Sequence, residues 1–345
     1  MSDFRTVAGF EDVWRPPVRP RVRRPEEVLS PADRAAGVRA RLQRIVRRAP
    51  EVMVKVTGRT RDPAHLAAHL TYITRNGRLA AEDRDGCLIA GRDDVADLAR
   101  DWSAAAMMDS RRRANSPFSV SLILSMPAGT DPLRLRDAAR AFAQETFADA
   151  REYVLALHTD TPHPHVHLTV RALADDGGRL NPRKGDLEAW RQAFARALRE
   201  RGVEAEATPR RARGVTRKAE RGPVLRLRER HAAGRRGLGR VAREKIRQAA
   251  ELAFGEPPAS TAWDRRIAAR QAQVRRIYLA QARLLQASTD PADRALGADV
   301  GVFVRSLRPP DTERLALARA LRDANEKSRP SVRPLGPQRD RSWRI

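Results

Sequence analysis

Four of the seven histidines cluster within ten residues, at His158, His163, His165 and His167. Because side chains alternate between the two faces of a strand, His165 and His167 project from the same side of a strand expected at His165–Arg171. His158 ends the preceding strand, across a turn at Asp160–Pro164, and can converge with them on one cation. Three neutral imidazoles leave coordination positions open, as a catalytic metal site requires. We therefore predict that these three histidines bind a divalent ion, against the simpler interpretation of surface histidines at a turn.

Two other residues of the cluster have supporting roles in this interpretation. Asp160 is placed to accept a hydrogen bond from a ligand imidazole and so to fix its tautomer. His163 has an odd spacing in the turn, which points its side chain away from the ligands, toward substrate or toward support of the site. The opposite face of the second strand carries an apolar stripe suited to a core, formed by Val166, Leu168 and Val170.

A candidate nucleophile lies earlier in the chain, which has only three tyrosines, Tyr72, Tyr153 and Tyr278. Tyr72 shares one face of a predicted helix with His65 and His69, at the spacing i, i+4, i+7. A phenol is protonated at neutral pH, so a base or a nearby cation must help to activate it. Taken alone, the position of Tyr72 favours an ordinary helix aromatic, and its role as a nucleophile depends on the other residues. His69 and Arg75, from the same segment, are further candidates for contact with DNA or for support of the ligands.

The elements that must position these side chains alternate between strands and helices. Strands are expected at Val52–Thr57, Phe118–Met126, Glu152–His158 and His165–Arg171. Helices are expected from Asp62 to Asn76, over Asp93–Met108, from Asp131 to Phe147, and over Leu187–Arg201. Phe118–Met126 alternates apolar residues with serines and therefore predicts a half-buried strand. The fold class expected is α+β, an antiparallel sheet with helices packed on it.

Composition predicts three regions. Residues 1–50 form a Pro/Arg-rich extension with little to bury, largely disordered apart from a short helix around Pro31–Arg48. Residues 51–222 form the compact domain, although a basic run after residue 205 has the composition of a linker or a nucleic-acid arm. Residues 223–345 form a basic, helical or partly disordered appendage, with helices near Val241–Phe254, Ala262–Gln286 and Asp311–Asn325.

The charge of the chain points to a polyanionic partner. The 345 residues include 68 Lys+Arg and 43 Asp+Glu, a formal net charge of +25, for which nucleic acid is the usual partner. We expect no membrane insertion, because no segment approaches the roughly 18 apolar residues of a spanning helix. The single cysteine, Cys87, excludes an internal disulfide and a cysteine-based zinc site. Without an evident export signal, the cytoplasm is the expected location.

These segments resemble a known family. HTDTPHPHVHLTV, residues 158–170, resembles the three-histidine motif of conjugative relaxases and plasmid mobilisation proteins of the HUH superfamily, and within it most resembles the T-DNA border endonucleases of plant-transforming bacteria. Three further segments follow the family's order, LTYITRNGRL at residues 70–79, SMPAGTD at Ser125–Asp131 and TRKAERG at Thr216–Gly222. The resemblance extends from about Val52 to Gly222, roughly half of the chain.

The resemblance implies residue roles. It makes His158, His165 and His167 the ligands of a divalent metal, Mg or Mn, and Tyr72 the nucleophile. It makes Asp160 a supporting acid that orients a ligand or accepts the tyrosine's proton. Arg171 stands where the family usually has Asn; it shares a face with His165 and His167, so it either clamps a phosphate or changes how the end of the motif is held.

The resemblance also implies an activity. It is a site- and strand-specific nick at a plasmid transfer origin, made by metal-assisted transesterification through a 5′-phosphotyrosyl adduct that is exported into a recipient cell. The implied partners are single-stranded and supercoiled DNA, an accessory DNA-binding protein and a secretion coupling protein. The alternatives are a replication initiator or transposase of the same superfamily, or a non-catalytic accessory protein that binds metal and DNA.

Overall fold

The computed structural model describes residues 4–15, 31–216, 222–235, 237–255 and 261–328. The chain divides into two compact units. Unit 1 comprises Met1–Pro209 with Ala280–Phe303, and unit 2 comprises Arg210–Leu279 with Val304–Ile345. All the site residues predicted from the sequence belong to unit 1. No described helix has the length and apolar character needed to cross a bilayer.

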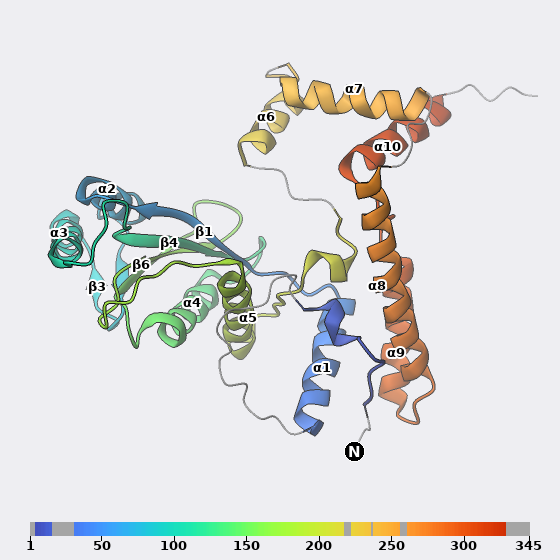
Figure 1. Ribbon diagram of the computed structural model, residues 1–345, viewed down its shortest axis with the longest axis horizontal. Helices are drawn as coiled ribbons and strands as arrows, with labels where there is room; N and C mark the ends of the chain where they lie inside the picture. Colours follow the sequence, from blue (N-terminus) through green and yellow to red (C-terminus); the bar gives the residue numbers. More distant parts are fainter. Residues whose placement is uncertain (1–3, 16–30, 217–221, 236, 256–260, 329–345) are drawn as a thin grey trace, which may run out of the picture. The chain divides into compact units, whose positions relative to one another are not determined.

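A six-stranded antiparallel sheet forms the centre of unit 1 (Figure 1). Its strands, in spatial order, are β1 (Met53–Thr60), β4 (Ser119–Ser125), β6 (His165–Arg171), β5 (Tyr153–His158), β2 (Ala81–Asp83) and β3 (Leu88–Ile89). The α+β class predicted from the sequence is confirmed. The short pair β2 and β3 was not predicted, because two or three residues are too few to establish a period of two.

Helices cover both faces of the sheet. On one face, α4 (Pro132–Phe147) and α5 (Lys184–Glu200) pack on the apolar stripe of the central strands, so that Val166, Leu168 and Val170 are buried in the main core as expected. On the other face, α2 (Pro63–Ile73) and α3 (Arg92–Met108) enclose a second core. The helix starts follow the predicted chemistry: Asp62 and Asp131 cap α2 and α4, each with Pro at the first position.

The predicted half-exposure of β4 is wrong. Its serine-bearing face is as buried as its apolar face, with Ser119, Ser121 and Ser125 at 5% exposure or less. The hydroxyls are accommodated by hydrogen bonds; Ser119 Oγ lies 2.7 Å from Thr60 Oγ1, and Ser121 Oγ bonds a histidine of α2. Buried hydroxyls cost little when they are hydrogen-bonded. The face predicted to meet solvent therefore supports the helix that carries the nucleophile candidate.

The described part of the N-terminal region differs from the extension expected there. Phe10, Val13 and Trp14 are buried around the short helix η1 (Glu11–Val13). The predicted helix is present as α1 (Pro31–Val46), and it buries Leu42. A few apolar residues thus suffice to pack these two segments into the fold. Residues 16–30, with most of the Pro/Arg-rich stretch, lie outside the described residues.

The chain after residue 205 is more helical than predicted. Its helices are η2 (Arg210–Arg213), α6 (Gly222–Ala232), α7 (Arg240–Phe254), α8 (Ala262–Gln286), α9 (Pro291–Arg305) and α10 (Glu313–Ser328). Of these, α6 falls within the expected linker and α9 was not predicted. In unit 2, α7 and α10 share a small core of Ala249, Leu252 and Ala318. The domain boundary near residue 222 stays a prediction.

Candidate active site

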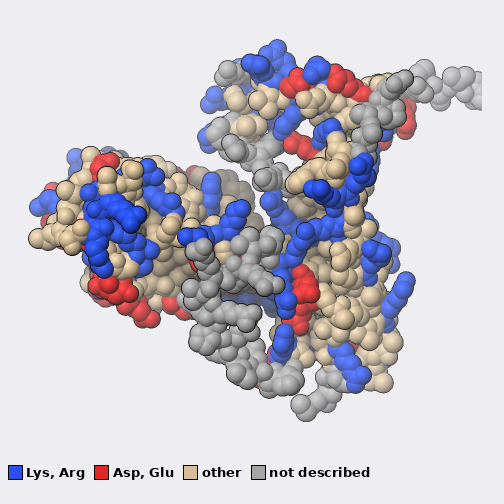
Figure 2. All heavy atoms as spheres, in the orientation of Figure 1, with Lys and Arg blue, Asp and Glu red and all other residues tan. Residues whose placement is uncertain are grey.

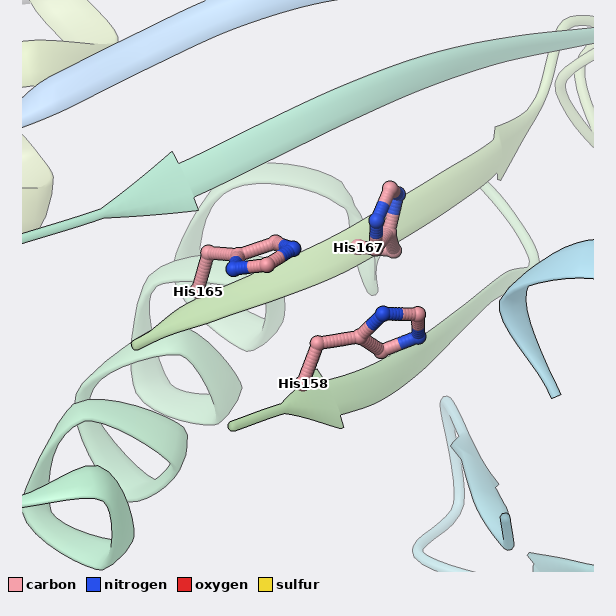
Figure 3. Close-up of side chains that lie close together, drawn as sticks. All are labelled: His158, His165 and His167. Carbon is pink, nitrogen blue, oxygen red and sulfur yellow. The ribbon is translucent and has the colours of Figure 1, made fainter. Parts of the chain in front are cut away.

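The three predicted ligands meet at one end of the central strands. β5 ends at His158 and β6 begins at His165, and these two residues are directly paired across the strands, while His167 lies one pleat further along β6. One nitrogen from each ring lies within 4.8 Å of those of the other two. Figure 3 shows the rings turned toward one another from the two strands. The tight turn between β5 and β6 and the alternation of side chains along β6 together produce this convergence.

Hydrogen bonds fix the tautomers of two of the rings. His158 Nε2 donates to the Ile73 carbonyl at 2.7 Å, because a carbonyl can only accept, and His158 Nδ1 accepts from Arg75 Nη2 at 3.2 Å. His165 Nδ1 donates to the His163 carbonyl at 3.1 Å. Each of these rings therefore has one nitrogen without a proton, the form that a metal ligand needs. In His158 that nitrogen accepts the hydrogen bond from Arg75, so a bound metal ion would replace this contact.

The third ring, that of His167, has a buried nitrogen that a bound cation would satisfy. His167 is buried, and its Nδ1 has no hydrogen-bond partner among the described residues. Burial, together with the nearby rings of His158 and His165, lowers the pKa of His167 to about 3. Burial also lowers the pKa of His158. His158 and His167 are thus held neutral at physiological pH. The donor set of three imidazoles fits a divalent ion.

Tyr72 lies against this cluster at the end of α2. Its side chain is 55% exposed, and its ring meets that of His167 edge to face, with centroids 5.8 Å apart. The guanidinium carbon of Arg75 lies 5.5 Å from the centre of the Tyr72 ring. The two other tyrosines, Tyr153 and Tyr278, are buried, at 1% and 0% exposure. Tyr72 is therefore the tyrosine that a DNA phosphate can reach.

The end of α2 is shaped to present Arg75. The amide of Asn76 donates to the Thr71 carbonyl at 2.7 Å, and that of Arg75 donates to the Tyr72 carbonyl at 3.2 Å. This is a Schellman ending, in which the residue after the cap adopts the left-handed conformation and is usually glycine. Here Arg75 takes that place with φ 53°. A bulky residue in a strained position at a site is a mark of function.

The structure gives Asp160 a different partner from the one predicted. Asp160 forms an ion pair with Arg75, and the ligand hydrogen bond assigned to it is made by the Ile73 carbonyl. His163 is exposed in the turn, as its spacing suggested, and supports His165 through its backbone carbonyl alone. Asp160 therefore reaches the cluster through Arg75.

Arg171 and His69 are each held by hydrogen bonds to neighbouring residues. Arg171 lies at the opposite end of β6 from His165, where it donates to Asp175 at 2.6 Å and to the Leu173 carbonyl at 3.2 Å. His69 is largely buried, with Nε2 2.8 Å from Ser121 Oγ and 2.9 Å from Thr169 Oγ1. Arg171 thus secures the turn after β6, and His69 fastens α2 to the sheet one turn before Tyr72.

One cation beside the cluster was missed by sequence reasoning. Lys55 of β1 pairs with Ile123 of β4, which in turn pairs with His167, so the three share one face of the sheet. Lys55 is exposed. The alternation of Val52–Thr57 placed Lys55 on the outward face, but only the strand order reveals that this face belongs to the histidines.

Comparison with known proteins matches the part of the chain that carries Tyr72 and the three histidines. A family model described as a MobA/VirD2-like relaxase nuclease domain matches residues 72–203, a range that begins at Tyr72 and includes all three ligands. The T-DNA border endonuclease VirD2 of Rhizobium radiobacter is 27% identical over 184 residues, covering 48% of this chain and 43% of that protein. The VirD2 proteins of Agrobacterium fabrum and Rhizobium rhizogenes are 28% and 27% identical over 187 and 186 residues.

The extent of these matches is partial. The Agrobacterium fabrum protein is covered over 41% of its length and the Rhizobium rhizogenes protein over 42%, each by 48% of this chain. The chain thus spans less than half the length of the curated relatives it matches. A solved structure from work on the molecular basis of vancomycin resistance transfer in Staphylococcus aureus aligns with 46% of this chain and 98% of its own, at 14% identity and a TM-score of 0.32, too low to support an argument.

Proposed function

Because the chain carries a relaxase nuclease domain of the MobA/VirD2-like family, we propose that it nicks one strand of DNA at a plasmid transfer origin and keeps the 5′ end on Tyr72. The observation that carries this proposal is the position of Tyr72, exposed at 55% and in ring contact with the buried His167. A nucleophile that accepts a DNA end must be open to solvent on the substrate side and held firmly on the other.

The reaction is a transesterification. Tyr72 Oη attacks the phosphorus, a new phosphorus–oxygen bond forms to the tyrosine, and the bond to the 3′ oxygen breaks. The phenol releases one proton and the departing 3′ oxygen takes one up, so the 3′ end leaves as a hydroxyl. One phosphodiester replaces another, and the same groups can therefore rejoin the strand.

The three histidines contribute to the proposed reaction through the charge of the metal ion that they would hold. His158, His165 and His167 would hold a divalent ion, expected to be Mg or Mn, which would supply positive charge next to the scissile phosphate. Burial keeps His158 and His167 neutral, and neutral imidazoles are available as ligands.

Arg75 and Asp160 complete the arrangement around the tyrosine. The Arg75 guanidinium lies beside the Tyr72 ring and pairs with Asp160. A fixed cation beside a phenol stabilises negative charge as it develops on the oxygen, and Asp160 is the candidate acceptor of the phenol proton. His69 acts as a positioning residue, since it holds the preceding turn of α2 to β4 and β6.

The wider setting follows from the same proposal. The substrates are single-stranded DNA and the transfer origin of a supercoiled replicon, reached in the cytoplasm. An accessory DNA-binding protein and a secretion coupling protein act with the enzyme, and the covalent adduct is exported with the DNA into a recipient cell.

The test is an adduct assay. The full chain is incubated with Mg²⁺ or Mn²⁺ and a single-stranded oligonucleotide from the origin region. One preparation of the oligonucleotide is labelled in the segment on the 5′ side of the nick, and a second preparation is labelled in the segment on the 3′ side. Label from the segment on the 3′ side of the nick should migrate with denatured protein. Tyr72→Phe should give no adduct, whereas Tyr153→Phe and Tyr278→Phe should retain it. Stable binding without an adduct in any metal would instead identify a non-catalytic accessory protein.

A further inference from the structure

One exposed cation lies on the face of the sheet that carries the histidine cluster, His158, His165 and His167. Lys55 of β1 pairs with Ile123 of β4, and Ile123 pairs with His167 of β6. Figure 3 shows β4 beside β6, on the side away from β5, and β1 follows β4 in the sheet. Lys55 is exposed, and Ile123 is half-buried. Two strand spacings, about 10 Å, separate the backbones of Lys55 and His167, so a phosphate over Ile123 can contact both sides.

A β-bulge decides on which face of the sheet each cation of β1 lies. The register of β1 against β4 shifts by one residue between Val56 and Gly58. After this bulge, Arg59 pairs with the same β4 residue as Val170, which belongs to the main core on the other face. Of the two cations of β1, Lys55 alone therefore lies on the face of the histidine cluster.

Tyr72 lies on the side of α2 that is nearer to β1. His69, one turn before Tyr72, bonds hydroxyl groups of β4 and β6. Ile73, on the other side of the helix, packs in the second core with residues of β5. Because the strand order is β1, β4, β6, β5, Tyr72 approaches the histidine cluster from the side of Lys55. The histidine cluster, Tyr72 and Lys55 therefore border one stretch of the sheet surface.

The charge of Lys55 is available to a ligand. Figure 2 shows Lys and Arg atoms, in blue, at many places on the surface, so positive charge alone does not identify a site. Arg75, the other cation beside Tyr72, is paired with Asp160 and donates a hydrogen bond to His158. Lys55 forms no ion pair and no side-chain hydrogen bond with any residue that the structure describes. An unneutralised cation beside a nucleophile favours an anionic substrate group.

The proposed reaction has a use for a cation at this place. A phosphodiester shares one negative charge between two non-bridging oxygens, and attack by a phenol oxygen adds to the charge around phosphorus. Fixed cations placed where this charge develops lower the barrier. A metal ion at the histidine cluster would lie on one side of the phosphate and leave the oxygen on the β1 side unmatched. The ammonium of a lysine, with three rotatable donors on a flexible stem, can follow the phosphate as its geometry changes.

We propose that the Lys55 ammonium binds the scissile phosphate at the non-bridging oxygen on the β1 side, across from the histidine cluster, and is a further catalytic residue of the transesterification. Lys55 keeps its proton throughout and contributes charge alone. The bonds that form and break are those already given for Tyr72. The inference rests on the proposed function for its substrate, while its own content is this second cation.

The test locates the phosphate by its charge. Protein carrying Tyr72→Phe, which has no phenol oxygen to form the adduct, is titrated with single-stranded oligonucleotides from the origin region. In each oligonucleotide one phosphate is replaced by a neutral methylphosphonate, at every position in turn. The affinity is measured with and without Mn²⁺. The position at which the neutral linkage removes the affinity gained from Mn²⁺ marks the phosphate at the histidine cluster.

Lys55→Gln, added to the same protein, should weaken binding of the unmodified oligonucleotide by about tenfold, the value of one charged hydrogen bond. The neutral linkage at the marked position should cost about tenfold when Lys55 is present and less than about twofold in Lys55→Gln, because both changes remove the same contact. Lys55→Arg keeps the charge and should keep this cost. The matched control is Lys184→Gln, which removes an exposed lysine of α5, the helix on the other face of the sheet. It should change the affinity by less than about twofold and leave the cost intact.

The outcomes separate this inference from the function on which it rests. Loss of the cost at the marked position in Lys55→Gln supports the inference, whether or not the adduct assay detects a link to Tyr72. An equal cost with and without Lys55 would overturn it, and the lysine would then serve to keep the edge strand β1 from pairing with another strand. A gain from Mn²⁺ that no neutral linkage removes would count against the proposed function as well. Lys55→Thr, which suits a strand, repeats the comparison, and the circular dichroism of each variant is compared with that of the parent.

Discussion

The two ends of the sheet in unit 1 differ in burial and in charge. At one end, three histidines drawn from ten consecutive residues are packed together, and burial holds His158 and His167 neutral. At the other end, arginines from three separated segments line one cavity, and three of them, Arg61, Arg111 and Arg113, are exposed. Burial suits ligands because it fixes geometry and suppresses protonation. Exposure instead keeps a cation hydrated and charged, because its charged form then loses no contact with water.

The largest expected effect separates chemistry from binding. Tyr72→Phe should abolish the covalent adduct, because the phenyl ring has no oxygen to accept the phosphate. Its affinity for single-stranded DNA should stay within about fivefold of the wild type, since one hydroxyl contributes about 1 kcal/mol. Denaturing gels and fluorescence anisotropy measure the two properties. An adduct that still forms in this variant would show that another residue is the nucleophile. The histidine end of the sheet would then lose its proposed chemical role.

The second effect tests the ligand set. His165→Ala should weaken Mn²⁺ binding and cleavage together, each by about 100-fold or more, since loss of even a supporting group costs 10- to 100-fold. His163→Ala is the matched control, because His163 is exposed and contributes only its backbone carbonyl; it should change either property by less than about threefold. Calorimetry that finds unchanged Mn²⁺ affinity in His165→Ala would refute the assignment.

The third effect concerns Arg75, which donates a hydrogen bond to His158 Nδ1 and pairs with Asp160. Arg75→Gly should lower the rate of adduct formation by about tenfold, since a charged contact of about 1.4 kcal/mol is lost. The same change should raise the free energy of unfolding by about 0.5 kcal/mol, because glycine adopts the left-handed conformation without strain. Chemical denaturation and single-turnover assays measure the two. Arg78→Gly, a change in the same loop, should alter neither the rate of adduct formation nor the free energy of unfolding. A lower free energy of unfolding in Arg75→Gly would show that the backbone is not strained at Arg75.

The smallest effect is a pH dependence of stability in the metal-free protein. The pKa of His167 is about 3 in the folded chain against an ordinary 6.5, so between these values the unfolded chain binds the extra proton. Stability should therefore decline as the pH falls from about 6.5 toward 3. His167→Gln should show a shallower decline than the wild type in urea denaturation series. Identical slopes for the two proteins would mean that His167 is not held neutral by burial, and the contrast between the two ends of the sheet would be weaker.

Local signals in the sequence predicted the chemical end of the molecule well. The N-cap and proline at Asp62–Pro63 and the alternation across His165–Arg171 depend only on neighbouring residues, and α2 and β6 follow them closely. The buried serine face of β4 could not be predicted, because alternation reports polarity and not what covers a face. The hydrogen bond that fixes the tautomer of a ligand imidazole was assigned to Asp160, which is near the ligands in sequence. In the structure His158 makes this bond to the Ile73 carbonyl, 85 residues away.

The sequence by itself determined which side chains can act as ligands and nucleophile, because a strand, a tight turn and a capped helix are short-range structures. The tertiary structure alone decided that Tyr72 is exposed while Tyr153 and Tyr278 are buried, that Arg75 bridges the tyrosine to the cluster, and that scattered arginines line one cavity. Exposure, charge balance and hydrogen-bond partners arise from the packing of segments far apart in the chain, so no local pattern records them.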